Sequence, residues 1–103
     1  AGFTVTLPAI ADAEAGWFCE LFVGTVTTSN NYIITEKTSA DTDKIVAFGL
    51  EVATTGAQIY SAGCTTITFQ ATPSLGDHVR IFCDGSRYIA KSITQDDAGV
   101  AFA

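Results

Sequence analysis

Few side chains in this 103-residue sequence could perform acid–base or nucleophilic chemistry. The single histidine, His78, directly follows Asp77. A Ser-His-Asp site requires the acid to contact the histidine ring. Neighbouring residues in a strand point to opposite faces of the sheet, however, which excludes the simplest pairing. We therefore expect His78 to be a surface residue at the start of a strand and not a general base.

Carboxylates are more plentiful, but their pattern does not form a site. A glycosidase needs two carboxylates at a set separation, and no spacing here implies one. Glu20 and Glu51 lie inside apolar segments, where we expect them on the outward face or at a subunit contact. Calcium takes six to eight oxygens, and neither Asp41-Thr42-Asp43 nor Asp96-Asp97 belongs to an EF-hand pattern. The sequence predicts no catalytic residue, no metal and no cofactor, and hence no enzyme.

The three cysteines are Cys19, Cys64 and Cys83. An odd number without a Cys-x-x-Cys pair argues against a disulfide framework or a zinc site. Free cysteine is usually buried, and thiols remain reduced in compartments where disulfides are rare. We expect buried free thiols, with one disulfide as the alternative.

Composition indicates one folded domain with an unusual surface. Apolar residues make up 48% of the chain and charged residues 16%, whereas about 25% is typical of soluble domains. This balance favours apolar surface that faces another subunit; the alternative is a well-packed monomer. The net charge of -6 and the scattered basic residues argue against binding to nucleic acid or to an anionic membrane. No apolar stretch approaches the roughly 20 residues of a membrane span.

Strand signals dominate the chain. The segment Ala9 to Gly16 predicts at most a single helical turn, because it is too short to be a stable helix. Asp84-Gly85 predicts a hairpin with a two-residue turn, in which Ile81 would face Tyr88 and Val79 would face Ala90. Gly24 is expected to form a bulge. Predicted strands cover residues 3–7, 17–26, 32–35, 45–53, 57–60, 65–70, 78–83, 86–93 and 99–103.

Short strands separated by turns at intervals of about 8–14 residues are typical of a sandwich or barrel. The predicted fold is all-β: a single domain, residues 1–103, with a jelly-roll-like β-sandwich or barrel of about eight short antiparallel strands. Residues 1–8 would be an N-terminal arm or an edge strand.

Two segments carry candidate contact residues. Trp17 and Phe18 point to opposite faces if they lie in one strand, so one of them is a candidate for a subunit contact. The alternating apolar residues of the first segment could instead add a strand to a partner's sheet or form an ordinary edge strand. The candidate capsid or subunit contacts are Phe3, Val5, Leu7, Trp17 and Phe18.

The layout resembles a known group of proteins. It runs from TLPAIADAEAGWFCELFVGTV (6–26) through NYIITE (31–36) to TTITFQATPSLGDHVRIFCDGSRYIAKSI (65–93) and GVAFA (99–103). This is similar to small β-structural proteins of tailed bacteriophages, including capsid decoration (cement) proteins and head or tail fibre domains. Gly76-Asp77 and Asp84-Gly85 match the closing hairpin. Cys83 and Tyr88 depart from the serine and tryptophan that are frequent there.

The resemblance implies a viral structural protein that stabilises a phage capsid. Such a protein would be a homotrimer that binds the major capsid protein at joints between capsomers. It would reside on the outer surface of the virion after assembly in the host cytoplasm. The alternative is a head- or tail-fibre domain that binds host surface glycans. A small hydrolase of the sandwich class is the weakest hypothesis.

Overall fold

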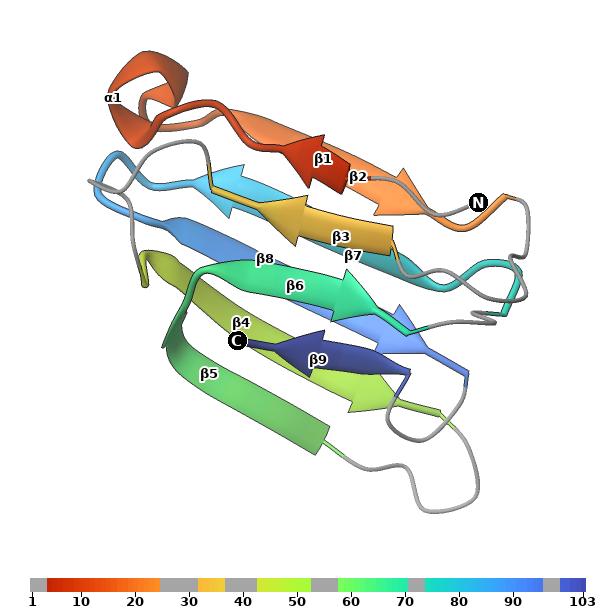
Figure 1. Ribbon diagram of the computed structural model, residues 1–103. Helices are drawn as coiled ribbons and strands as arrows, with labels where there is room; N and C mark the ends of the chain where they lie inside the picture. Colours follow the sequence, from red (N-terminus) through yellow and green to blue (C-terminus); the bar gives the residue numbers. More distant parts are fainter. Residues whose placement is uncertain (1–3, 25–31, 37–42, 53–57, 71–73, 96–98) are drawn as a thin grey trace.

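Two β-sheets lie face to face in the computed structural model, which describes residues 4–24, 32–36, 43–52, 58–70, 74–95 and 99–103 (Figure 1). The four-stranded sheet has the order β1 (Thr4–Thr6), β3 (Tyr32–Thr35), β6 (Thr66–Phe69) and β9 (Val100–Phe102). The five-stranded sheet has the order β2 (Phe18–Phe22), β7 (His78–Cys83), β8 (Tyr88–Thr94), β4 (Ile45–Glu51) and β5 (Gln58–Cys64). The prediction of an all-β sandwich is confirmed.

Two strand pairs in the described residues are parallel, in a fold that we expected to be antiparallel. Strand β1 pairs with β3, and β4 pairs with β8, in parallel registers. In the first case the chain crosses to the other sheet as β2 before it returns as β3, so the two neighbours run in the same direction (Figure 1). Strand β1 forms one edge of its sheet, which corresponds to the edge-strand alternative for the N-terminal segment.

The hairpin of β7 and β8 forms at the Asp-Gly pair with a longer turn than predicted. Cys83 pairs with Tyr88, so four residues separate the strands, and Ile81 pairs with Ala90. The carboxylate of Asp84 accepts hydrogen bonds from the N–H groups of Ser86 (2.8 Å) and Arg87 (2.9 Å). These bonds provide acceptors for two backbone donors of the wider turn. Because the register moves by two residues, every side chain keeps its predicted face.

The bulge lies on β5 and not at Gly24. Ala62 and Gly63 both lie opposite Val46, between the pairs Ile45–Cys64 and Ala47–Ser61. This extra residue lets β5 continue beyond the predicted end at Tyr60. The chain then enters the other sheet as β6 after the single residue Thr65.

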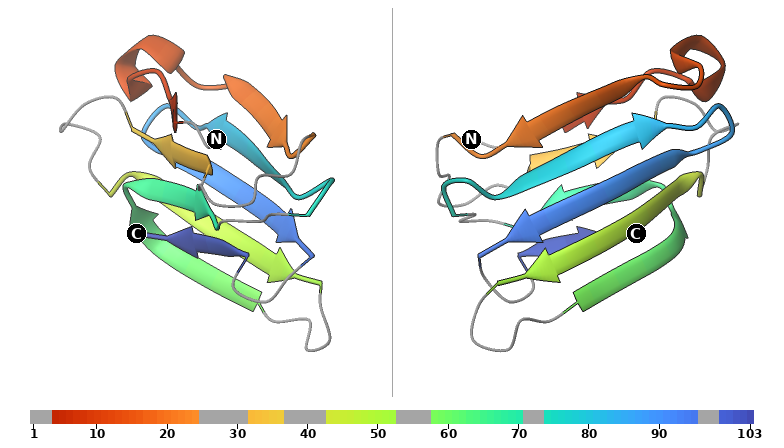
Figure 2. Two further views of the ribbon diagram at one scale, coloured as in Figure 1. Left: turned by 45° about the vertical axis from the view of Figure 1, so that its right-hand side comes forward. Right: turned by 180° about the vertical axis from the view of Figure 1, so that it is seen from behind.

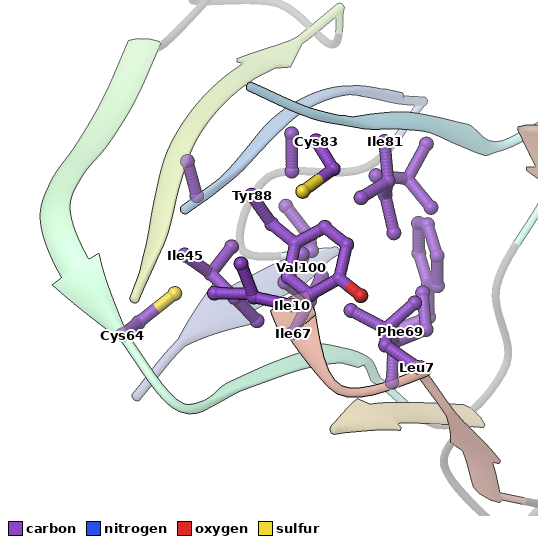
Figure 3. Packing of buried hydrophobic residues seen from close by; sticks show 14 residues of the cluster. Leu7, Ile10, Ile45, Cys64, Ile67, Phe69, Ile81, Cys83, Tyr88 and Val100 are labelled. Atoms are coloured by element: carbon purple, nitrogen blue, oxygen red, sulfur yellow. The ribbon is translucent and has the colours of Figure 1, made fainter. Parts of the chain in front are cut away.

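The core fills the space between the sheets, with Tyr88 at its centre (Figure 3). The Tyr88 side chain is fully buried, donates a hydrogen bond to the carbonyl of Pro8, and meets the Trp17 ring edge-on at 5.8 Å between centroids. Helix α1 (Ile10–Ala13) is the predicted single turn, and its Ile10 packs into the core at one end of the sandwich. No helix in the described part of the chain is long and apolar enough to cross a membrane.

Candidate protein-binding surface

Asp77 and His78 have separate surroundings, as their adjacency predicts. The buried carboxylate of Asp77 accepts the backbone N–H groups of Ser74 (3.0 Å) and Gln95 (2.9 Å). Nδ1 of His78 lies 3.0 Å from the carbonyl oxygen of Gly76, which requires the proton on that nitrogen. Asp77 therefore joins the two ends of the β7–β8 hairpin and does not orient the histidine.

The other candidate chemical groups remain dispersed. Glu20 is exposed on β2 as expected, but the prediction for Glu51 is wrong. Glu51 is the last residue of β4, points inward and is 4% exposed. Residues Asp41, Asp96 and Asp97 lie outside the described residues. Among the residues that the structure describes, no three of His, Cys, Asp and Glu gather in a way that could hold a metal ion.

The cysteines are free thiols, two of them buried and Cys19 half-buried. Burial raises the pKa of Cys19, and burial is also the main reason that the pKa of Cys64 rises to about 11. A thiol with a raised pKa holds little thiolate at neutral pH and is a poor nucleophile. These two cysteines therefore act as small apolar residues.

The predicted contact residues fall into different environments. Leu7 is 1% exposed and belongs to the core, while Val5 and Trp17 are half-buried and pack against it. Phe18 alternates with Trp17 and is 63% exposed. Phe3 lies outside the described residues. Of the described candidates, Phe18 alone presents a largely exposed side chain.

Phe18 belongs to a larger apolar surface, the outward side of the five-stranded sheet, here called the outer face. No described element crosses it in the view from behind (Figure 2, right). Cross-strand register arranges its side chains in three rows. One row contains Phe18, Phe82, Ile89 and Val46; the central row contains Glu20, Arg80, Lys91, Phe48 and Tyr60; the third contains Phe22, His78, Ile93, Leu50 and Gln58.

Several side chains of this face are largely exposed. Phe22 is 71% exposed and Tyr60 is 62% exposed, and Phe48, Leu50 and Ile93 are also exposed. The outward side of the other sheet is different, because threonines of β1, β3 and β6 line most of it, together with Ile33 and Ala101. An exposed apolar sheet face of this kind is typical of a protein interaction site.

A shallow groove of about 570 Å³ crosses the outer face over β8, β4 and β5. The rings of Phe48 and Tyr60 lie on it with centroids 5.0 Å apart and planes tilted by 47°. Gln58 and Lys91 also line the groove. A second, apolar cavity of about 310 Å³ opens between the sheets, where Val5, Leu21 and Tyr32 are among its lining residues.

Sequence reasoning identified Phe18 but missed the exposed apolar residues of β4 and β5. The available signal was the unbroken apolar segment IVAFGL at residues 45–50. A strand that is apolar on both sides is typical of a sheet covered on both faces. The structure covers one face of this strand and leaves the other exposed.

Comparison with models of known protein families, with curated proteins and with solved structures found no significant match to this chain.

Proposed function

We propose that this chain is a non-catalytic structural protein that binds a larger protein assembly through its outer face. The sequence resemblance favours a tailed-phage capsid as this assembly. The chain decorates and stabilises that capsid by binding the major capsid protein at joints between capsomers on the outer surface of the virion. Neither nucleic acid nor a membrane is part of this role.

The observation that carries the proposal is the exposed apolar side of the five-stranded sheet. Four aromatic rings, Phe18, Phe22, Phe48 and Tyr60, are exposed on it. Each buried Å² of apolar surface contributes about 25 cal/mol, so leaving these rings in water forgoes considerable stabilisation. Packing them against a partner would recover it. A sheet also gives a partner a rigid surface, since its backbone hydrogen bonds are already formed.

Many copies on one particle would strengthen such binding. Each copy needs modest affinity if several joints of the same assembly are held at once. The low charge of the chain, 16% of its residues, suits surfaces that are removed from water between subunits.

The test is binding to capsids built from the major capsid protein of the same genome. We expect the wild-type protein to sediment with these capsids, and the double variant F18S/F48S to lose most of its binding because two exposed rings are removed. Leu75→Ser is the matched control, since Leu75 is 68% exposed but lies in the turn before β7, outside the outer face. Thermal unfolding should show that both variants remain folded. Binding by F18S/F48S at the wild-type level would contradict the proposal.

The groove favours one second candidate, a fibre domain that binds host glycans. Aromatic rings and polar side chains together can hold a sugar, and Phe48, Tyr60, Gln58 and Lys91 provide both. A glycan array probed with wild type and with Tyr60→Ala distinguishes this function from capsid binding. Glycan signals that disappear in Y60A would support it, and an array without signals would argue against it.

A further inference from the structure

We propose that the partner of the outer face is a different protein, whose apolar surface carries carboxylates that pair with Arg80 and Lys91. The inference rests on the proposed function and specifies the chemistry of the partner. Its basis is the central row of the outer face, which combines charge with apolar surroundings.

Arg80 and Lys91 lie directly opposite each other on β7 and β8. Both side chains are exposed, and neither forms an ion pair or a side-chain hydrogen bond with any described residue. Apolar residues lie on either side of them, with Phe82 and Ile89 in one neighbouring row and Ile93 in the other. A partner that covers these apolar rows must also cover the two cations between them.

Covering a cation without a counter-charge is costly, because the cation loses its hydration and gains nothing in return. A carboxylate at the matching position of the partner removes that cost and fixes the register of the complex. Arg80 can accept such a carboxylate with two parallel hydrogen bonds.

The charge distribution of the whole chain supports this assignment. Of its eleven acidic and five basic residues, the described residues in the three rows of the outer face include one acid and two bases, Glu20, Arg80 and Lys91. The remainder of the chain therefore has a more negative net charge than the whole chain, and the outer face is locally basic. An acidic surface on a partner would be attracted to this face and repelled by the rest of the molecule.

Face-to-face packing with a second copy about a two-fold axis along the middle of the sheet does not meet this requirement. Strand β8 is the middle strand of the five-stranded sheet. A two-fold axis along it would place Lys91 against the same residue of the second copy, and Arg80 against Phe48. Like charges brought together in an interface are unfavourable, so the arrangement of the row favours a different protein.

Nucleic acid and anionic membranes fit the face less well. Both require several cations to meet phosphates, whereas this face has two cations, and Glu20 lies opposite one of them. The aromatic rows also favour a dry protein contact over a hydrated phosphate surface.

The experiment compares R80E/K91E with the wild type and with the control K44E/R87E. Lys44 and Arg87 are exposed basic residues that directly precede β4 and β8, beyond the three rows of the outer face, so the two variants change the net charge equally. Binding to capsids and to the peptides acetyl-Leu-Glu-Leu-Glu-Leu-amide and acetyl-Leu-Lys-Leu-Lys-Leu-amide is measured at several salt concentrations. NMR of the Arg80 and Lys91 side chains in the wild type reports the site of peptide contact.

We expect R80E/K91E to bind capsids about tenfold or more weakly than the wild type, with a smaller salt dependence, and K44E/R87E to bind within about twofold of it. The Glu peptide should shift the Arg80 and Lys91 signals and bind more tightly than the Lys peptide. If the wild type binds the Glu peptide in this way but not capsids, the proposed function fails and the inference stands.

Capsid binding that is unchanged in R80E/K91E would overturn the inference and leave the proposed function intact. Two further results would also overturn it. One is a change of oligomeric state in R80E/K91E, which would mean that a second copy covers the face. The other is tighter binding to phosphatidylserine vesicles than to the Glu peptide, which would make the partner a membrane.

Discussion

Asp77 illustrates how individual polar groups in this chain serve the scaffold. Its carboxylate accepts the N–H groups of Ser74 and Gln95, and its own carbonyl accepts the N–H of Val23. One residue therefore connects the start of β7, the end of β8 and the end of β2. Tyr88 has a comparable role in the core, where its hydroxyl donates to the Pro8 carbonyl.

Replacing Asp77 should weaken the fold without changing the outer face. Asp77→Ala leaves two backbone donors without their acceptor, and each unsatisfied buried donor costs about 1–3 kcal/mol. We expect the free energy of unfolding in urea to fall by about 2 kcal/mol or more, and to fall less in Asp77→Asn, which keeps one acceptor oxygen. Asp12→Ala, an exposed change on α1, is the control. Equal stability of D77A and D12A would refute this role.

Asp84 gives the hairpin a dependence on pH. Hydrogen bonds from the N–H groups of Ser86 and Arg87 lower the pKa of its carboxyl. Because the folded state has the lower pKa, this contribution to stability is complete at pH values above the pKa of the unfolded chain. It is lost as the pH falls through the folded value.

NMR titration of the Asp84 carboxyl should therefore give a midpoint below its ordinary value of about 3.9. In urea unfolding, Asp84→Asn should be less stable than the wild type at pH 7, and the difference should shrink in acid. Glu20→Gln, which also removes one exposed negative charge, is the comparison. A difference between D84N and the wild type that is constant from pH 2 to 7 would argue against this mechanism.

At the scale of elements, the β5 bulge controls how the chain passes from one sheet to the other. A Cβ atom added at Gly63 would lie 2.6 Å from the backbone carbonyl oxygen of Asp43. Side-chain and backbone bonds between Asp43 and Thr65 hold the same corner together. The missing side chain at Gly63 thus permits the close approach that carries β5 into β6.

The variant Gly63→Ala should force these two segments apart. Overpacking of this kind typically costs about 1–3 kcal/mol, and we expect the free energy of unfolding to fall by that amount. Gly24→Ala is the matched control, because a Cβ atom there would meet nothing within 4 Å. If the two alanine variants unfold at the same urea concentration, the close approach at Gly63 does not limit the fold.

At the scale of the whole molecule, the two outward sides of the sandwich differ in character. Threonines line the four-stranded side, while aromatic and aliphatic residues line the outer face of the five-stranded sheet. A molecule with one apolar face is suited to lie against another surface by that face.

The homotrimer that the sequence resemblance implies is testable by light scattering coupled to size-exclusion chromatography. We expect a mass three times the 10.8 kDa of one chain. Since a cyclic trimer joins one patch of each copy to a different patch of the next, F18S/F48S should keep this mass if the trimer contacts lie outside the outer face. A mass of one chain at all concentrations would refute the trimer and leave the outer face to be tested by capsid binding.

Local sequence patterns were sufficient to predict the class of fold, because such patterns specify strands. Alternation in residues 65–70, the position of the hairpin at Asp84-Gly85, though not the length of its turn, and the single helical turn near Ile10 were predictable from near neighbours in the chain. The assignment of Asp77 and His78 to different surroundings was equally local.

Which apolar residues remain in water depends on how the strands pair and pack. The apolar segment at residues 45–50 has the composition of a strand that is buried on both faces. Parallel pairing with β8 and antiparallel pairing with β5 place Phe48 and Leu50 on a face that no described element covers. The placement of Arg80 beside Lys91 depends on the same sheet, since the residues are eleven positions apart in the sequence and become neighbours through register. Side-chain type determines what a strand contributes, but the partner strands and the packing of the second sheet determine which face meets solvent.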